Sequence, residues 1–249
     1  MIEQNKELEK DFFNRYGQKS GYDRFSDSGY HKLMQWFGSV VSPRPGESIL
    51  DLGCGSGAFT ARLKEAYPQQ NIMGIDISTA CIEKAAKDYP GISFQVGDVE
   101  NTGLQTNSMD IVCYSGVLHH FPNTEKVATE AFRILKPGGR FFSFDPHHHN
   151  PAFWLYRSKR SPFYSPVGVT PNERLMTARE VNQVFSRAGL RVKTRIISGI
   201  AFCYVESNKG KSLLSLYNCL DGILGATPLA RFIGAWVIGW GDKPVTAAA

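Results

Sequence analysis

Hydrophobic positions along the first half of the chain follow two alternating patterns. Short apolar runs predict buried strands at 49–52, 72–75, 92–96, 111–115 and 140–144. Apolar residues at helical spacing between these runs predict helices near 58–67, 79–89 and 124–135. Strands that alternate with helices are typical of βαβ units, in which helices cover both faces of a parallel sheet. The pattern therefore predicts an α/β fold.

Two amphipathic helices are expected before the first strand. They cover residues 3–16 and 28–41, and apolar side chains at i, i+3, i+4 and i+7 give the second helix a buried face. The stretch SPRPGES at 42–48 breaks the helical pattern. We therefore expect a helical N-terminal segment over residues 1–45 and a main domain over residues 46–249.

The pattern changes beyond the fifth predicted strand. Several prolines between Pro146 and Pro171 predict an irregular loop over the active face. A helix is expected to begin at Thr177, in a capping box with Glu180, and to end before Gly189. Later apolar runs predict a strand over 191–205, a helix over 212–224 and a last strand over 235–240. Residues 146–176 and 206–234 would then be insertions on the substrate side of the domain.

The composition fits one folded domain. The 249 residues are 42% hydrophobic and 20% charged, and the formal net charge of +5 is small, which argues against a disordered chain. The five cysteines form no CxxC pair, so neither a disulfide framework nor a zinc knuckle is indicated. The N-terminus lacks the apolar core of a signal peptide, and polar residues interrupt the apolar stretch 213–240. We expect a cytoplasmic protein without a transmembrane segment.

The segment ILDLGCGSGAFT at 49–60 combines a predicted strand, a glycine-rich turn and the start of a helix. Ligands of parallel sheets bind beyond the carboxyl ends of the strands, and Gly53, Gly55 and Gly57 would let the backbone approach a ligand closely. Asp76 ends the next strand, where a carboxylate can accept hydrogen bonds from both hydroxyls of a ribose. Asp98 follows the third strand, in a position to meet the amino group of a purine.

Three carboxylates surround this turn, because Asp51 precedes it. They would repel a pyrophosphate and suit a positively charged nucleoside. Here the chain resembles the class I S-adenosylmethionine-dependent methyltransferases, over residues 46–189. The motifs that carry the resemblance are the acidic residue with GxGxG, the two later acids, MDIVCYSGVLHH at 109–120 and LKPGG at 135–139.

The resemblance implies a three-layer αβα, Rossmann-like fold with a seven-stranded, mostly parallel sheet whose last strand is antiparallel. It implies S-adenosyl-L-methionine as the cofactor, and O- or N-methylation of a small molecule as the activity. It also implies that residues 1–45 form a helical lid over the donor. The residues expected to bind the cofactor are Asp51, Gly53, Cys54, Gly55, Gly57, Asp76, Ile77, Asp98, Val99 and Ser115.

Two other functions fit part of this pattern. Gly53, Gly55 and Ala58 satisfy the GxGxxG/A fingerprint of nicotinamide-dependent oxidoreductases. Asp51 argues against that reading, because dinucleotide folds normally place an apolar residue there, and Gly57 is an additional glycine. A relative that binds S-adenosylmethionine without catalysis stays open, because such a protein would keep the turn and Asp76.

Candidate bases follow the fourth predicted strand, in the stretch SGVLHHFP at 115–122. His119 or His120 would accept the proton of a hydroxyl or ammonium acceptor, and Asp145 would orient the imidazole. The alternative is that these histidines only pack against the loop or hydrogen-bond it. The adjacent histidines 147–149 have no further ligands at suitable spacing, so no metal is expected, and His147 is expected beside the acceptor.

Two regions are expected to shape the acceptor site. The N-terminal aromatic residues would lie over the donor, with Tyr16 and Tyr22 in contact with the substrate. Residues 151–249 hold 13 Lys and Arg against 5 Asp and Glu, including the cluster RSKR at 157–160. This charge predicts an anionic or lipid-like acceptor and allows peripheral contact with a membrane. The basic residues lack interleaved stacking aromatics, which argues against nucleic acid, and the sequence gives no oligomeric state.

Overall fold

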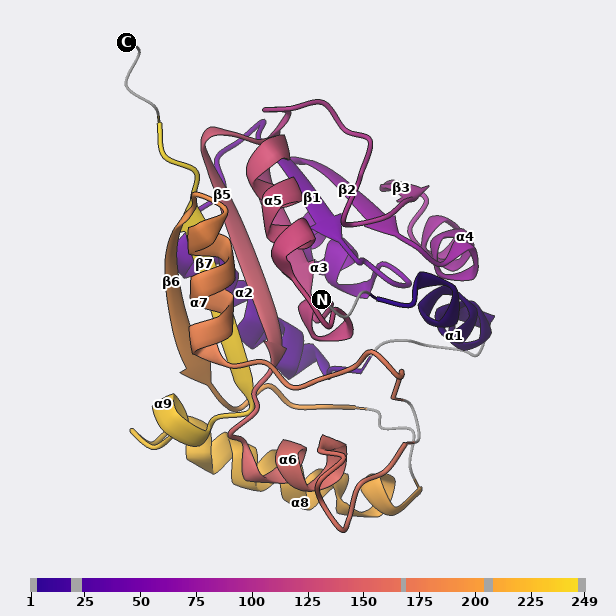
Figure 1. Cartoon of the computed structure of the whole chain (residues 1–249), viewed down its shortest axis with the longest axis vertical. Coiled ribbons are helices and arrows are strands. Elements are labelled where there is room, and N and C mark those ends of the chain that lie inside the picture. The colour runs from indigo at the N-terminus through magenta and orange to yellow at the C-terminus, as the bar shows by residue number, and fades with distance from the viewer. Residues whose placement is uncertain (1–3, 19–23, 167–168, 204–207, 246–249) are drawn as a thin grey trace.

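Seven strands form one twisted sheet in the computed structural model, which describes residues 4–18, 24–166, 169–203 and 208–245 (Figure 1). The strands lie in the order β3-β2-β1-β4-β5-β7-β6. Their bounds are β1 Ser48–Leu52, β2 Asn71–Asp76, β3 Ser93–Val96, β4 Met109–Ser115, β5 Leu135–Pro146, β6 Arg191–Ile197 and β7 Trp236–Asp242.

The first five strands pair in parallel, and β7 runs antiparallel to both of its neighbours, β5 and β6. Strands β1 and β4 are almost wholly buried, because helices cover both faces of the centre of the sheet. These strands are rich in apolar residues for that reason, and β1 also contains the buried Asp51. The α/β fold and the antiparallel last strand are confirmed.

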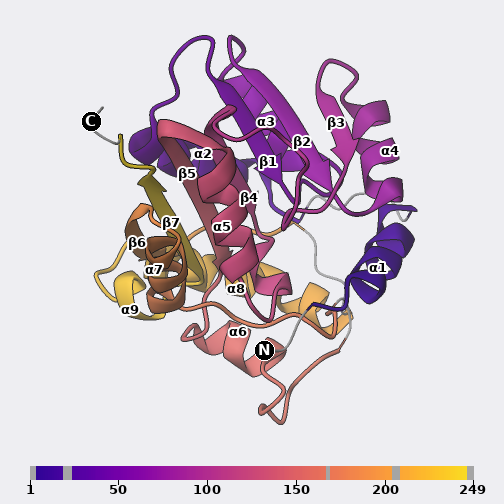
Figure 2. The ribbon, with the colours of Figure 1, turned by 45° about the horizontal axis from the view of Figure 1, so that its top comes forward.

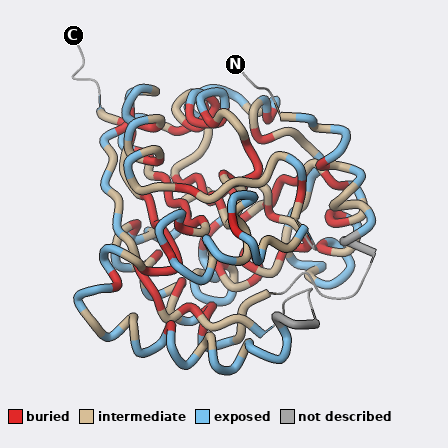
Figure 3. The backbone as a smooth tube through the Cα atoms, turned by 60° about the horizontal axis from the view of Figure 1, so that its bottom comes forward, coloured by how far each residue is buried: buried red, intermediate tan, exposed pale blue. Residues whose placement is uncertain are grey.

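Helices cover both faces of the sheet. Their bounds are α1 Lys6–Gln18, α2 Asp27–Val41, α3 Ala58–Ala66, α4 Thr79–Asp88, α5 Glu125–Ile134, α6 Pro151–Arg157, α7 Ala178–Arg187, α8 Asn208–Gly225 and α9 Ala230–Ile233, with a 3-10 turn, η1, at Leu118–His120. The apolar faces of α5 and α7 pack into one core, and those of α2 and α3 into another. The tube in Figure 3 shows the buried stretches gathered inside a shell of exposed turns and helix faces.

The two N-terminal helices have different surroundings. Helix α2 packs against the sheet through Leu33, Phe37 and Val41, all of them buried. Helix α1 lies next to α4 at the β3 edge of the sheet (Figure 2). The expectation of a lid over residues 1–45 stays a prediction, and only α1 occupies a peripheral position suited to it.

The prediction of an irregular loop between residues 146 and 171 was wrong in one respect, because this stretch contains helix α6. The Asn150 side chain accepts the backbone N–H of Phe153 and caps this helix, and Pro151 occupies its first turn, where a missing N–H costs nothing. The strand expected over 191–205 ends at Ile197. Thr177 and Glu180 form the predicted capping box at the start of α7.

Candidate active site

A cavity opens at the carboxyl ends of β1, β2 and β4, where the sequence predicted a ligand. Residues from the N-terminal helices, the segment around α6 and the segment after β6 complete its walls. The predicted site residues that line it are Gly53, Cys54, Gly55, Asp76, Ile77, Asp98, Val99, Ser115, His119 and His120.

The glycine turn follows β1 directly and has left-handed backbone at Gly53, with φ +73°. The backbone N–H groups of Gly53 and Cys54 both donate to the carbonyl oxygen of Ile75, at 2.7 and 3.0 Å, and so fix the turn to the end of β2. A Cβ atom at Gly53 would lie 2.3 Å from Cγ2 of Val117. Only a glycine satisfies both the backbone angle and the space at this position.

Asp51 lies behind the turn and does not line the cavity. Its carboxylate accepts hydrogen bonds from the Thr60 hydroxyl at 2.7 Å and the Ser115 hydroxyl at 2.9 Å. Burial raises the pKa of Asp51 to about 7, against which these two bonds act. Asp51 therefore joins β1 to α3 and to the end of β4 by hydrogen bonds. Of its two partners, Ser115 lines the cavity, so Asp51 can orient a side chain that faces a ligand.

Asp76 lines the cavity and also holds the glycine turn in place. One carboxylate oxygen accepts the backbone N–H of Gly55 at 2.8 Å, and the other accepts that of Ser78 at 2.8 Å. Burial raises the pKa of Asp76, and the two backbone bonds oppose that rise. Each oxygen keeps a further lone pair, so the carboxylate can accept hydroxyl groups from the cavity side.

Asp98 is engaged by the N-terminal helix. The Lys6 ammonium lies 2.5 Å from Asp98 and 2.5 Å from Glu100, and this cation joins α1 to the loop after β3. The backbone N–H of Glu100 donates to the other oxygen of Asp98 at 2.9 Å. No motif in the sequence points to Lys6, which lies 92 residues away from Asp98 in the chain.

His119 and Asp145 form a buried pair at the end of β4 and β5. One Asp145 oxygen lies 2.8 Å from Nδ1 of the imidazole and also accepts the backbone N–H of His119 at 3.1 Å. Burial lowers the pKa of His119 well below its usual range and raises that of Asp145 to about 8. The His119 ring is therefore held in one orientation and is neutral at neutral pH.

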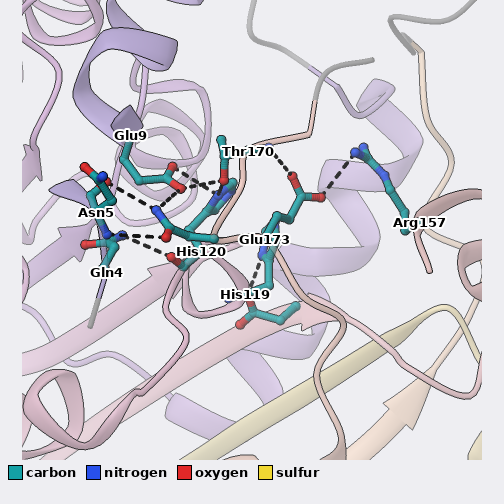
Figure 4. Close-up of polar contacts among 10 residues, drawn as sticks. Gln4, Asn5, Glu9, His119, His120, Arg157, Thr170 and Glu173 are labelled. Carbon is teal, nitrogen blue, oxygen red and sulfur yellow. Dashed lines mark hydrogen bonds and ion pairs between the residues drawn. The ribbon is translucent and has the colours of Figure 1, made fainter. Parts of the chain in front are cut away.

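His120 belongs to a second network, shown in Figure 4. Its Nδ1 atom lies 3.4 Å from the Glu9 carboxylate and 3.3 Å from the Thr170 hydroxyl, which itself donates to Glu9. The side-chain amide of Gln4 donates to the His120 carbonyl at 3.0 Å. The loop after β4 is thus bound to both α1 and the segment before α7.

The remaining wall of the cavity is basic and aromatic. Arg157 of α6 lies 3.2 Å from Glu173, and Arg24 also lines the cavity. Although burial opposes ionisation of Glu173, Arg157 holds the pKa of this carboxyl below its ordinary value. The aromatic part of the wall consists of Phe12, Phe13, Phe25, Tyr30, Phe59, Phe121, Phe144, Phe153, Phe202 and Trp236.

Several predicted residues lie elsewhere. His147 is buried, and its Nδ1–H donates to the carbonyl of Gly234 at 2.9 Å, so its side chain fixes the turn before β7. Gly57 lies at the start of α3, below the cavity wall. The side chain of Tyr16 and the whole of Tyr22 lie outside the described residues.

Ligand atoms of His119, His120 and Glu173 lie within 4.8 Å of one another, a set that could hold a metal ion. The guanidinium of Arg157 already neutralises Glu173. A divalent cation would have to displace it or lie close to a like charge. The arrangement is therefore an ion pair beside two imidazoles.

Within the described ranges, none of the helices is long and apolar enough to cross a membrane.

Comparison with known proteins decides the family. A methyltransferase-domain family model matches residues 50–143. Demethylmenaquinone methyltransferase of Lactococcus lactis is 30% identical over 186 residues, which are 67% of this chain and 71% of that protein. This chain belongs to the class I S-adenosylmethionine-dependent methyltransferases. The resemblance inferred from the glycine turn and its acids is thereby confirmed, and the nicotinamide alternative is not favoured.

Other relatives match over shorter segments. Trans-aconitate 2-methyltransferase of Deinococcus radiodurans is 30% identical over 115 residues, 46% of this chain and 43% of that protein. An uncharacterized transposon protein of Streptomyces fradiae is 36% identical over 43% of this chain and 32% of its own length. The chain thus spans less than half the length of these two relatives.

Solved structures show the same fold. A chain of the complex between the Haloferax volcanii Trm112 methyltransferase activator and a putative methyltransferase has a TM-score of 0.69 at 18% identity, covering 96% of this chain and 99% of that one. A Haemonchus contortus phosphoethanolamine N-methyltransferase 2, in complex with phosphomonomethylethanolamine and S-adenosylhomocysteine, has a TM-score of 0.68 at 17% identity, covering 94% and 60%.

The residues of the cavity fit the cofactor of this family, S-adenosylmethionine. The turn at Gly53 leaves space that a Cβ would fill, and Asp76 offers carboxylate lone pairs beside it. Asp76 and Asp98 line the cavity as carboxyl groups, and Lys6 already pairs with Asp98. The arrangement agrees with a positively charged nucleoside rather than a pyrophosphate.

Proposed function

We propose that this protein transfers a methyl group from S-adenosylmethionine to an oxygen or nitrogen atom of a small molecule that carries an anionic group and an apolar part. The observation that supports this most is a single cavity, lined at one end by the glycine turn with Asp76 and at the other by His119, Arg157 and aromatic rings. Donor and acceptor can therefore meet in one enclosed space.

The donor end holds the nucleoside. Asp76 would accept the ribose hydroxyls, Asp98 and the backbone around Val99 would contact the adenine, and the turn at Gly53 would approach the remainder of the cofactor, since all of these residues line the cavity. When bound, S-adenosylmethionine supplies an activated methyl group on sulfur, and S-adenosylhomocysteine remains after transfer. The chain mainly has to hold the acceptor in line with that methyl group, and such positioning can lower the barrier by about 7 to 11 kcal/mol.

His119 removes the proton of the acceptor. Its Nδ1–H donates to Asp145, which leaves the Nε2 lone pair as the proton acceptor on the cavity side. Because burial keeps the imidazole neutral, His119 is in the basic form at neutral pH. The Asp145 oxygen at 2.8 Å holds the imidazole ring in the orientation that this proton transfer needs.

The acceptor end combines positive charge with apolar surface. Arg24 and Arg157 line the cavity near His119, Arg157 in an ion pair with Glu173, and Phe153, Phe202 and Trp236 line it as well. Guanidinium groups suit carboxylate or phosphate oxygens, and the rings suit an apolar chain. The name of one relative contains demethylmenaquinone, and that of one protein with the same fold contains phosphoethanolamine, which agrees with an apolar acceptor or a phosphorylated one.

The test is a transfer assay with methyl-tritiated S-adenosylmethionine and paired acceptors. Each acceptor carries a hydroxyl or an amine together with a phosphate or a carboxylate. The two members of a pair differ only in whether they also carry a long apolar chain. We expect label in an acceptor, and S-adenosylhomocysteine in equal amount. His119→Ala should lower kcat about 10²- to 10⁴-fold, whereas His31→Ala, on the exposed side of α2, should not.

Two outcomes contradict the proposal. If the protein binds S-adenosylmethionine but releases no S-adenosylhomocysteine with any acceptor, the non-catalytic alternative replaces it. If transfer occurs and His119→Ala keeps the wild-type kcat, as the control His31→Ala should, His119 is not the base.

A further inference from the structure

Exposed apolar side chains gather at one end of the molecule. Nine of the twelve exposed large apolar side chains in the described part of the chain lie within residues 154–163, 213–223 and 229–232. These residues belong to α6 and the loop after it, to α8 and to α9. Figure 1 shows these helices together below the sheet, and Phe153 of α6 stacks on Tyr217 of α8 with ring centroids 6.2 Å apart. We call this surface the α6–α8–α9 face.

Helix α8 turns its apolar side outward. Leu213, Leu216, Leu220 and Ile223 recur at i, i+3, i+7 and i+10 on one side of the helix, and each is 57 to 60% exposed. The opposite side faces the protein through Tyr217, which packs on Phe153 and Phe202, and through polar groups. Asp221 is buried and accepts the backbone N–H of Gly199 at 2.6 Å.

A second polar residue on α8 makes the same kind of contact. The Asn218 side chain accepts the N–H of Phe202 and donates to its carbonyl, at 3.0 and 2.8 Å. A helix that packs only against its own domain would place the leucines inside and these polar groups outside. The row of exposed leucines on the other side therefore suits contact with a second apolar phase.

The charge of this face indicates which kind of partner it would bind. Within residues 151–172 and 208–233 the sequence contains a single acidic residue, the buried Asp221. Lys159, Arg160, Lys211 and Arg231 are exposed there. Apolar side chains bordered by cations match the acyl boundary and headgroups of an anionic bilayer. A second copy of the chain fits less well, because its cations would oppose these.

We propose that the α6–α8–α9 face docks the protein on an anionic lipid bilayer and opens the acceptor end of the cavity to that bilayer. Phe153 and Arg157 belong to α6 and line the cavity, and Phe202, held by Asn218 of α8, lines it too. The same elements therefore form the docking surface and the acceptor wall. The docking rests on the exposed face alone, and only the delivery of the acceptor rests on the proposed function.

The test is co-sedimentation of the full chain with two kinds of vesicle, phosphatidylcholine alone and phosphatidylcholine mixed with phosphatidylglycerol. We expect binding to the mixed vesicles, weakened by salt, and at least tenfold weaker binding to the neutral ones. The double variant Leu216→Gln/Leu220→Gln should weaken binding at least tenfold. Val245→Gln, which changes an exposed apolar residue outside the face, should bind as the wild type does.

Urea unfolding of each variant shows that it is folded, and the methyl-transfer assay separates the two proposals. Vesicle binding without any methyl transfer would leave the docking in place and contradict the proposed function. The docking itself is overturned if the wild type does not bind mixed vesicles, if the leucine variant binds them equally well, or if the wild type sediments as a dimer that the leucine substitutions dissociate.

Discussion

Gly53→Ala tests whether the glycine turn has the geometry that a donor requires. Gly53 has φ +73°, and a Cβ there would lie 2.3 Å from Cγ2 and 2.7 Å from Cβ of Val117. Gly46, just before β1, provides a matched control. It has φ +82°, but no atom lies within 4 Å of the position that its Cβ would occupy. Both substitutions strain the backbone, and only the one at Gly53 also creates a clash.

The expected magnitudes follow from these two effects. Left-handed backbone costs an alanine about 1 to 2 kcal/mol, so Gly46→Ala should lower the free energy of unfolding by that amount. The contact with Val117 adds an overpacking cost of about 1 to 3 kcal/mol. Gly53→Ala should therefore be destabilising by about 2 to 5 kcal/mol, the sum of the two costs.

Urea unfolding and calorimetric titration with S-adenosylmethionine measure the two consequences. Gly46→Ala should bind the donor as tightly as the wild type, because Gly46 does not line the cavity. Gly53→Ala should lose measurable binding while still folded at low temperature. Equal stability and equal donor affinity of the two variants would refute the account of the turn.

Three further changes test other parts of the structure. Lys243→Met removes the ammonium that donates to the carbonyls of Phe132 and Leu135 and to Asn107; urea unfolding should show a loss of about 1 to 3 kcal/mol, and no loss would contradict this role. Asp145→Asn should lower kcat about 10²- to 10⁴-fold with little change in KM; a change confined to KM would argue against its action through His119. Because burial raises the pKa of Asp51 to about 7, the folded state holds this proton more tightly than the unfolded state does. Its contribution to stability is full below the ordinary carboxyl pKa, falls by about 3 kcal/mol between pH 4 and pH 7, and disappears above pH 7. The stability difference between wild type and Asp51→Asn should show this fall, and a flat difference would exclude it.

The central part of the fold could be predicted from the sequence because periodicity and motif spacing are local. Strands β1 to β5 begin or end within a few residues of their predicted positions, except for the early start of β5 at Leu135, which pairs with Met109. The prolines between residues 146 and 171 predict a loop, whereas the structure has helix α6 there, beginning at Pro151. In the first turn of a helix, with Asn150 as the cap, a proline favours the helix instead.

The donor half of the site was predictable and much of the acceptor half was not. The donor residues follow successive strands, so the topology of a parallel sheet brings them together. Glu9 and Thr170 are 161 residues apart and meet only through the packing of α1. Glu173 and Arg24 belong to segments without a local motif. His147 was expected at the acceptor because of its neighbours, but an extended segment turns alternate side chains to opposite sides, and this one faces Gly234.

The central claim is that the cavity beyond β1 and β2 binds S-adenosylmethionine through the glycine turn and Asp76. Calorimetric titration of the wild type and of Asp76→Asn measures this directly. We expect saturable binding to the wild type, competition by S-adenosylhomocysteine, and at least tenfold weaker binding to the variant, since a hydrogen bond to a charged group contributes about 1.5 to 3 kcal/mol. Uptake of a nicotinamide dinucleotide in place of both sulfur compounds by the folded wild type would contradict the claim.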